Sequence, residues 1–262
     1  MQQRHRDPTI IFEEQKFTVS QYILPLIAQF VNIGANKRIL EVGFGVGGNM
    51  SPFVEKELSV VGVDLNANKL KVARKKYAEH TLNGQVVIIE DDIYNLSPAL
   101  IGKFDIIFLK DTIEHIYDQG RFLIHIRNFL KRDGILFISF PPYYMPFGGH
   151  QQICSSPFLS KSPYIHLLPN KLYTLLLQVA GESSGKIDVL LNIKTTGISI
   201  DRLKRLFKFH QYQTLYEAIY LINPNYEIKF GLKPKLQLSL ISKIAHLRSI
   251  ISTCAYYIVR AI

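Results

Sequence analysis

Short apolar runs alternate with amphipathic stretches over the first half of the chain. The apolar runs, each short and rich in Val, Ile and Leu, are predicted as buried strands and cover residues 38–43, 58–64, 85–90, 104–110 and 134–140. The amphipathic stretches are predicted as helices and cover residues 49–57, 67–80 and 118–131. Strands that are apolar on both faces and are separated by helices are typical of a parallel sheet covered on both sides.

A further helix is predicted before the first strand, over Thr18–Val31. Thr18 or Ser20 would cap this helix, and Gly34 lies near its end. Pro25 falls close to the first turns, where proline is best tolerated.

The regular alternation stops after the fifth strand. Residues 141–198 are rich in Pro, Gly, Ser and Tyr, with one predicted helix at Lys171–Val179. We interpret this segment as an insertion that lies over the carboxyl edge of the sheet. A basic amphipathic helix is predicted from Ser199, and residues 213–222 and 226–232 are predicted to form a closing antiparallel hairpin.

The tail, residues 236–262, places its apolar side chains on one helical stripe and is predicted to be an amphipathic helix. Lys243, His246, Arg248 and Arg260 flank that stripe. Such a helix either docks on its own domain or a second subunit, or lies on a membrane surface as a peripheral contact.

The length of 262 residues favours one domain. The expected division of residues 1–262 is a core at 37–140, an inserted cap at 141–198, a last helix with the closing hairpin at 199–232, and the tail helix at 236–262. The oligomeric state is left open.

Composition narrows the class of protein. The hydrophobic fraction of 47% suits a globular core, and no uncharged apolar run reaches the length of about 18 residues that predicts a membrane span. The N-terminus has no apolar run of the secretory type. Cys154 and Cys254 alone build neither a disulfide framework nor a thiolate metal site, so we expect a cytoplasmic protein with no metal.

Charge is distributed unevenly along the chain. Residues 1–120 carry 13 Lys and Arg against 15 Asp and Glu, whereas residues 121–262 carry 18 against 6. The basic half is compatible with an anionic acceptor, a nucleic acid or an acidic membrane surface, and equally with a solvated basic surface that has no particular partner.

A glycine-rich turn follows the first predicted strand, in the segment ILEVGFGVGGNM (39–50). Gly43, Gly45 and Gly48 fit G-x-G-x-x-G between a strand and a helix, and Gly47 lies in the same turn. Glycines there permit a tight turn and close approach of a ligand. By itself the pattern suits a dinucleotide, a flavin or S-adenosylmethionine.

Acidic residues at the strand ends favour the last of these ligands. Glu41 precedes the first glycine, where a pyrophosphate would be repelled but an ammonium or sulfonium would be attracted. Asp64 ends the second strand, where a carboxylate can accept bonds from ribose hydroxyls. Asp91 or Asp92 after the third strand could receive an adenine amino group. Each of these acids could instead be a capping or turn residue.

Between about Lys37 and Pro142 the sequence resembles the class I S-adenosylmethionine-dependent methyltransferases, in the form typical of ubiquinone-biosynthesis-type, small-molecule enzymes. ILEVGFGVGG, VVGVD, EDDI (90–93), FDIIFLKDTIEHI (104–116) and FLKRDGILFISFPP (129–142) resemble successive motifs of that family. The insertion at 141–198 does not match any of these family motifs.

The resemblance implies a doubly wound, Rossmann-like α/β fold with a mostly parallel seven-stranded sheet. It implies S-adenosylmethionine as the cofactor and S-adenosylhomocysteine as its product. The positions that match the cofactor-binding motifs are Glu41, Gly43, Gly45, Gly47, Asp64, Leu65, Asp92, Ile93, Lys110 and Asp111.

Methyl transfer is an in-line displacement that mainly requires alignment, with a base only where the acceptor must lose a proton. His150, in the loop after the fifth strand, is the first candidate base and His115 the second. Either histidine could be purely structural. We expect transfer to oxygen of a small-molecule or glycan/lipid-precursor acceptor, which could be lipid-linked, and the basic half is compatible with an anionic one.

Three other functions stay open on the sequence. A nicotinamide-dependent oxidoreductase has a similar sheet, and a domain that binds the cofactor without turnover has the same motifs. A nucleic-acid methyltransferase is suggested only by the basic half. PPYY (141–144) resembles part of an amino-directed nucleic-acid motif, but Phe140 stands where that motif has a polar residue, and the segment follows the fifth strand instead of the fourth.

Overall fold

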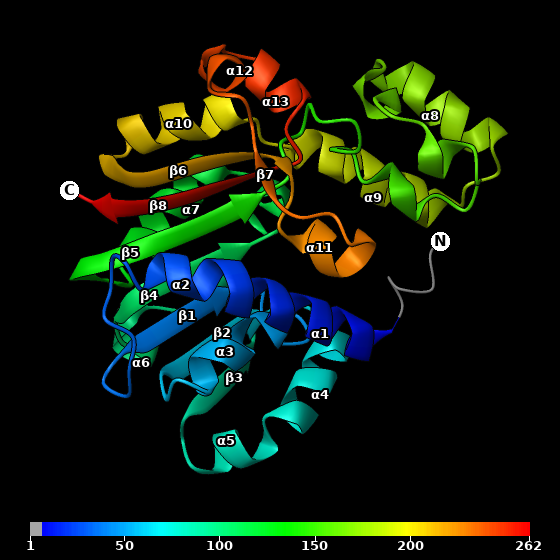
Figure 1. Ribbon diagram of the computed structural model, residues 1–262. Helices are drawn as coiled ribbons and strands as arrows, with labels where there is room; N and C mark the ends of the chain where they lie inside the picture. The colour runs from blue at the N-terminus through cyan, green and yellow to red at the C-terminus, as the bar shows by residue number, and fades with distance from the viewer. Residues whose placement is uncertain (1–6) are drawn as a thin grey trace.

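The computed structural model describes residues 7–262 and contains one eight-stranded sheet in the order β3-β2-β1-β4-β5-β8-β6-β7 (Figure 1). The strands are β1 (Arg38–Val42), β2 (Ser59–Asp64), β3 (Val86–Glu90), β4 (Phe104–Lys110), β5 (Leu130–Phe140), β6 (Tyr212–Ile222), β7 (Lys235–Leu236) and β8 (Cys254–Ala261). The first five run parallel to one another, while β8 pairs antiparallel with both β5 and β6. The expected α/β fold is confirmed, with eight strands in place of seven.

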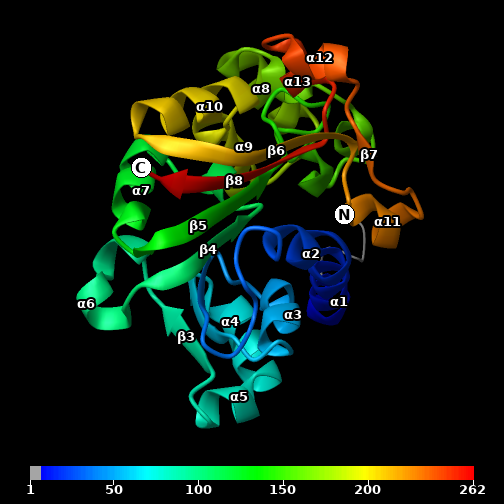
Figure 2. The ribbon, with the colours of Figure 1, turned by 60° about the vertical axis from the view of Figure 1, so that its left-hand side comes forward.

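Helices cover both faces of the sheet (Figures 1 and 2). One face carries α1–α4 and the other carries α7 and α10, and each pair of layers encloses a separate apolar core. The α-helices are α1 (Pro8–Thr18), α2 (Leu24–Ile27), α3 (Ser51–Val54), α4 (Ala67–Lys76), α5 (Ala78–Leu82), α6 (Pro98–Ile101), α7 (Gln119–Arg127), α8 (Asn170–Val179), α9 (Ser184–Thr196), α10 (Ile200–Phe209), α11 (Asn225–Phe230), α12 (Ser239–Lys243) and α13 (Leu247–Ile250).

Strand β4 is buried on both faces, and this explains why the predicted strands are apolar runs. All seven of its residues are buried, and successive side chains point to opposite faces of the sheet. Ile107 and Leu109 join the core beneath α7, whereas Ile106 and Phe108 join the core beneath α1 and α3. Because the centre of the strand has cores on both sides, its four consecutive residues 106–109 are all apolar, and the charged residues Asp105 and Lys110 lie near its ends.

The N-terminal helix starts earlier than predicted. It begins at Pro8, where Asp7 Oδ1 accepts the Thr9 N–H at 2.8 Å, and it continues through a π-helical turn into α2. The predicted start at Thr18 is therefore wrong, because the Thr18 hydroxyl donates to the Glu14 carbonyl within the helix. A capping Asp followed by Pro was the stronger start signal. Residues 1–6 of the expected single domain lie outside the described part.

The first strand of the predicted closing hairpin, residues 213–222, is present as β6, but the predicted second strand, residues 226–232, is not a strand. Residues 226–232 contribute to helix α11, and β6 pairs instead with β8, from Tyr212↔Ala261 to Tyr220↔Cys254. The predicted tail helix 236–262 is also wrong, because its last third is the buried strand β8, inserted between β5 and β6. A run of aromatic and β-branched residues with few charges fits a buried strand as well as a helical stripe.

The insertion forms a small layer of its own beyond the carboxyl ends of β4 and β5 (Figure 1). Helix α8 appears where it was predicted, whereas α9 was not predicted. The two helices enclose a third apolar cluster that includes Cys154, Leu159, Tyr173 and Leu177. A layer with its own core can hold side chains firmly over the sheet edge.

We predict that Gly62→Ala destabilises the fold. A Cβ at Gly62, in β2, would lie 2.2 Å from the buried Phe44 ring, and that ring has no room to move. Overpacking of this kind costs about 1–3 kcal/mol. Urea unfolding measures the loss, and Gly185→Ala in α9 is the matched control, because a Cβ there meets nothing within 4 Å. Equal stabilities of the two variants would contradict this packing.

Candidate active site

The glycine turn after β1 has the backbone that its residues allow. Gly43, Gly45 and Gly47 have φ of +84°, +56° and +83°, which is the left-handed region that favours glycine. Gly48 is required for a different reason, since a Cβ there would lie 2.4 Å from the Phe12 carbonyl in α1. The turn is thus held open above the end of β1, while the N-terminal helix packs directly against it.

Asp64 fixes this turn from the end of β2. Its Oδ2 accepts the Gly45 N–H at 2.8 Å, and its Oδ1 accepts the Asn66 N–H at 2.7 Å. Because Asp64 is at the carboxyl end of a strand adjacent to β1, it lies beside the turn and stays partly exposed. Each carboxylate oxygen keeps a lone pair for a further donor.

A cavity of about 490 Å³ opens along this edge of the sheet. Its size lies in the range of small-molecule sites. Of the predicted cofactor residues, the cavity is lined by Gly43, Asp64, Leu65, Asp92, Ile93 and Asp111. Leu65 is 73% exposed, so an apolar surface is available to a flat ring. The predicted convergence of the ends of β2, β3 and β4 on one crevice is thus present.

Asp91 and Asp92 both line this cavity and both also stabilise the local chain. Asp92 caps a short 3-10 turn by accepting the Tyr94 N–H at 3.0 Å. Asp91 accepts from the Asn95 side chain at 2.7 Å. These contacts give no reason to prefer Asp91 or Asp92 as the carboxylate that would accept an adenine amino group.

Glu41 lies beneath the cavity and does not line it. Its side chain is fully buried on the α1 side of the sheet, where Oε1 accepts from Asn49 Nδ2 at 2.7 Å and Oε2 has no hydrogen-bond partner. Burial raises the pKa of Glu41 well above its ordinary value, although the Asn49 bond opposes the shift. Gly45 and Gly47 likewise shape the turn without lining the cavity.

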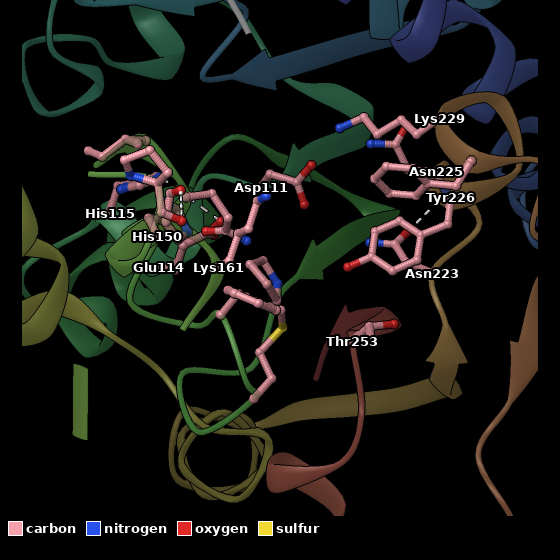
Figure 3. Close-up of a pocket in the computed structure, with 18 of the residues that line it drawn as sticks. Asp111, Glu114, His115, His150, Lys161, Asn223, Asn225, Tyr226, Lys229 and Thr253 are labelled. Carbon is pink, nitrogen blue, oxygen red and sulfur yellow. Dashed lines mark hydrogen bonds and ion pairs between the residues drawn. The ribbon is translucent and has the colours of Figure 1, made fainter. Parts of the chain in front are cut away.

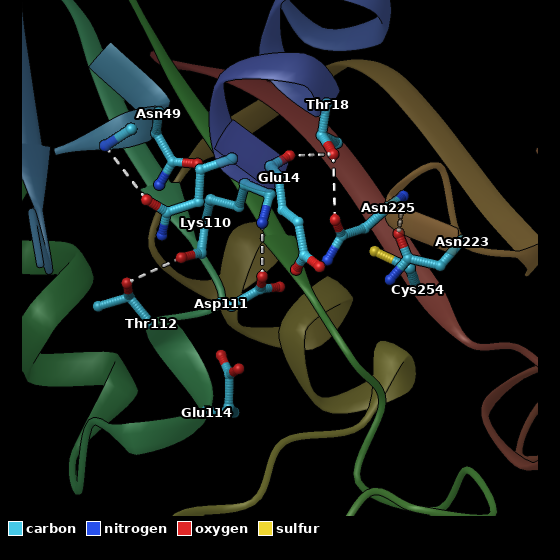
Figure 4. Close-up of polar contacts among 12 residues, drawn as sticks. Glu14, Thr18, Asn49, Lys110, Asp111, Thr112, Glu114, Asn223, Asn225 and Cys254 are labelled. Carbon is cyan, nitrogen blue, oxygen red and sulfur yellow. Dashed lines mark hydrogen bonds and ion pairs between the residues drawn. The ribbon is translucent and has the colours of Figure 1, made fainter. Parts of the chain in front are cut away.

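Lys110 and Asp111 form an ion pair at the end of β4 (Figure 4). The Lys110 ammonium is buried and lies 2.7 Å from Asp111 Oδ2. The surroundings of Asp111 oppose its ionisation, but the nearby ammonium outweighs them and keeps the pKa of Asp111 below its ordinary value. Lys110 does not line the cavity described above, so we expect it to act on the cofactor site only through its ion pair with Asp111.

Glu114, His115 and His150 come together from two loops (Figure 3). The rings of His115 and His150 meet edge to face at 5.1 Å between centroids. One ligand atom of each of the three residues lies within 4.8 Å of the other two, so they could hold a metal ion, which the sequence did not predict. Neither oxygen of the buried Glu114 carboxyl accepts a hydrogen bond, although its Oε1 lies 4.0 Å from His115 Nε2.

The electrostatics of this cluster favour neutral groups. Burial raises the pKa of Glu114 well above its ordinary value, and the Asp111 charge adds to the effect. Burial also lowers the pKa of His150 to about 4, with His115 contributing. An imidazole that stays neutral near pH 7 can accept a proton.

A second cavity, of about 610 Å³, begins at this cluster and extends toward α11 (Figure 3). The inserted cap supplies His150 and Lys161, and the opposite wall is formed by Asn223, Asn225, Tyr226 and Lys229. Asp111 and His115 line both cavities, which therefore adjoin at the ends of β4.

The α11 wall was missed by the sequence reasoning, which placed its residues in a hairpin. In the structure α11 is fixed to the N-terminal helix (Figure 4). The Thr18 hydroxyl lies 3.1 Å from Asn225 Oδ1, and Lys229 lies 3.5 Å from a Glu14 carboxylate oxygen. No local sequence signal predicts a contact over more than 200 residues. The pattern Asn-Pro-Asn before α11 was an alternative signal for a helix start.

Comparison with known proteins agrees with this geometry. Residues 40–138 match the family model of a methyltransferase domain. Over these residues the chain is similar to the class I S-adenosylmethionine-dependent methyltransferases. This similarity, together with the acids at the sheet edge, favours a methyltransferase over the nicotinamide-dependent alternative.

Among curated proteins, the chain is similar to ubiquinone biosynthesis O-methyltransferases. It is 34% identical over 122 residues to the protein of Actinobacillus pleuropneumoniae serotype 7 (strain AP76), covering 44% of this chain and 52% of that one. It is 32% identical over 124 residues to the protein of Pasteurella multocida (strain Pm70), covering 44% and 51%. The chain thus spans about half the length of the curated relatives it matches.

Solved structures share the fold. A geranyl diphosphate C-methyltransferase from Streptomyces coelicolor A3(2) superposes with a TM-score of 0.58 at 11% identity, covering 93% of this chain and 77% of that one. A Haemonchus contortus phosphoethanolamine N-methyltransferase 2 superposes with a TM-score of 0.57 at 15% identity, covering 99% and 58%. The names of these relatives include O-, C- and N-methyltransferases.

The buried Glu41 carboxyl should make stability depend on pH. Because its folded-state pKa is raised, the unfolded chain releases this proton first, and the free energy of unfolding falls as pH rises above the unfolded pKa. Glu41→Gln keeps the shape but cannot ionise. In cofactor-free protein, the stability of this variant relative to the native chain should rise from pH 4.5 to 7.5 in urea unfolding. A parallel pH dependence of the two proteins would contradict the prediction.

Proposed function

We propose that this chain transfers a methyl group from S-adenosylmethionine to an oxygen atom of a small-molecule acceptor. The observation that carries the proposal is that the two cavities adjoin at Asp111 and His115. One cavity suits the cofactor and the other the acceptor, so the reacting atoms would meet in line at that junction.

The residues of the first cavity fit this cofactor. Asp64 has free acceptor capacity toward ribose hydroxyls, and Asp92, with Ile93 beside it, is placed to meet an adenine ring against Leu65. Glu41 lies beneath the cavity near the glycine turn, so when ionised it would favour an ammonium group there through its charge and not through direct contact. When bound, the cofactor supplies an activated methyl group on a sulfonium.

His150 is the proposed base, with His115 as the second candidate. The acceptor hydroxyl would lose its proton to a neutral imidazole nitrogen as its oxygen forms the bond to the methyl carbon and the carbon–sulfur bond breaks. Burial lowers the pKa of His150 to about 4, so its imidazole is neutral and has a free lone pair near pH 7, but it is a weaker base than an exposed histidine. Transfer to oxygen is supported by the likeness to ubiquinone biosynthesis O-methyltransferases.

The acceptor site carries polar and charged groups at its far wall. Asn223, Asn225 and Lys229 face a cap that contributes Lys161. These donors suit an acceptor with an oxygen-rich or anionic group away from the reacting hydroxyl. A small molecule fits a cavity of about 610 Å³, whereas a folded nucleic acid does not.

Asp64→Ala should weaken the binding of S-adenosylmethionine by at least about tenfold, because each hydrogen bond to a charged group contributes about 1.5–3 kcal/mol. Isothermal titration calorimetry measures the affinity. Glu90→Ala is the matched control, since Glu90 ends the neighbouring strand β3 but lines no cavity and pairs only with the exposed Arg74. Equal affinities of the two variants would remove Asp64 from the cofactor site.

His150→Ala should lower kcat by about 10²- to 10⁴-fold, the range for loss of a general base, while leaving cofactor affinity unchanged. Single-turnover methylation of a hydroxylated acceptor measures the step, with His80→Ala, distant from both cavities, as the control.

A chelator distinguishes a base from a metal ligand. If His150 acts as a base, activity is unchanged after EDTA treatment. Activity that is lost with EDTA and restored by a divalent transition metal such as Zn²⁺ or Fe²⁺ would instead make His150, with Glu114 and His115, the holder of an ion.

A further inference from the structure

Large apolar side chains exposed to solvent gather in two segments of the chain. In the described part of the chain, 24 such residues occur, and 14 of them lie in residues 141–181 and 228–250. These two segments make up only 64 of the 262 residues. Exposure of single apolar residues is normal, but a concentration of this kind indicates a contact surface.

Helix α8 shows the pattern most clearly. Leu172, Leu175 and Val179 follow one another at intervals of three and four residues within α8, which places them on one face of the helix. Leu172, Leu175 and Val179 are 54%, 56% and 80% exposed. The opposite face of α8 is already used, because Tyr173 and Leu177 are buried in the core of the cap. The exposed leucines therefore contribute nothing to the fold of the cap.

Both segments are also free of acidic residues. No Asp or Glu occurs in residues 141–181 or 228–250, whereas these ranges hold seven Lys and Arg. Lys229 and Arg248 are paired, with Glu14 and Asp201. The other five leave an excess of positive charge beside the exposed apolar residues. Such a combination suits an anionic lipid surface.

Part of each segment lies at one end of the molecule, whereas α11, which ends at Phe230, lies lower in both views. Helices α8 and α12 are both at the top of Figure 1 and of Figure 2, and the two views differ only by a turn about the vertical axis. Leu240 in α12 is 74% exposed. We call the exposed apolar side chains of residues 158–179 and 230–244, with the lysines between them, the docking face.

The docking face also borders the acceptor cavity. Phe158 is 75% exposed, and its near neighbours Pro157, Ser160 and Lys161 line that cavity. On the other side, Phe230 is both exposed and part of the cavity wall. A surface that covers the docking face would therefore lie at the entrance of the second cavity.

We propose that the docking face binds the surface of an anionic membrane and that the acceptor enters the second cavity from that membrane. The apolar side chains would enter the interfacial region while the lysines meet the lipid headgroups. The described chain has no helix long and apolar enough to cross a bilayer, so the contact would be peripheral. The acceptor part of this proposal rests on the proposed function, whereas membrane binding does not.

Charge argues against a second copy of the chain as the occupant. In a symmetric dimer the same patch meets itself, so a patch that holds cations and no acids would face its own cations. Anionic headgroups compensate that charge directly. The membrane therefore fits both the apolar and the basic parts of the face.

Vesicle sedimentation tests the proposal with the full chain. The native protein should bind vesicles of phosphatidylglycerol and phosphatidylcholine, and it should bind phosphatidylcholine alone much more weakly. Added salt should also reduce the binding, because the lysines contribute to it. Leu172→Glu/Leu175→Glu should weaken binding by at least about tenfold, since two apolar contacts are lost and two charges are repelled.

Leu82→Glu/Leu100→Glu is the matched control. Leu82 and Leu100 are 89% and 69% exposed but belong to α5 and α6, outside the docking face. This variant should bind like the native protein. No binding of the native protein to anionic vesicles, or an equal loss in both variants, would overturn the proposal. A native dimer that Leu172→Glu/Leu175→Glu dissociates would overturn it in favour of a second copy.

Calorimetry with S-adenosylmethionine separates this proposal from the proposed function. Both double variants should bind the cofactor like the native chain, because neither changes the first cavity. Vesicle binding without cofactor binding would support the docking face and contradict the methyltransferase function. Cofactor binding without vesicle binding would support the methyltransferase function and contradict the docking face.

Discussion

The parallel pairing of β1 with β2 and β4 is the constraint on which the site depends. Val42 pairs with Val63, and Glu41 with Phe108, so the three strands end at nearly the same level. Parallel strands bring their carboxyl ends to one edge of the sheet. The acids that follow β2, β3 and β4 therefore converge without any contact between them. The glycine turn leaves space above that edge, and Asp64 holds it in place.

Charge at this edge is balanced from within the sheet. Lys110 is the buried cation, and it keeps Asp111 ionised where the two cavities adjoin. Glu41 and Glu114 have no such partner, and burial raises the pKa of each. The free protein thus avoids an accumulation of buried negative charge. A cationic ligand at the edge, such as the proposed cofactor, would favour ionisation of these same groups.

The parallel half of the fold and the cofactor edge could be predicted from the sequence because both depend on local patterns. Each strand is an apolar run, and Gly43, Asp64 and Asp92 follow directly from positions in or after such runs. The closing strands could not be predicted in the same way. Residues 254–261 fit a helical stripe and a buried strand equally well, and only the space between β5 and β6 decides between them.

The acceptor side depended on contacts between distant parts of the chain. Asn225 and Lys229 reach the second cavity because α11 packs against the N-terminal helix, through Thr18 and Glu14. Their own segment gives no sign of that contact. The exposure of the apolar face of α8 could not be predicted from the sequence either, because an apolar stripe on a helix normally indicates core packing. Membrane contact, first considered for a helix over the whole tail, is now proposed for α8 together with the first part of that tail, residues 236–244.

The central claim is that the sheet edge is a site for S-adenosylmethionine, and calorimetric titration tests it most directly. The purified chain would be titrated with S-adenosylmethionine, S-adenosylhomocysteine and NAD under the same conditions. We expect the first two to bind in the micromolar range and NAD not to bind, because the acids at the edge attract a sulfonium and an ammonium and repel a pyrophosphate. Binding of NAD without binding of S-adenosylmethionine would contradict the account.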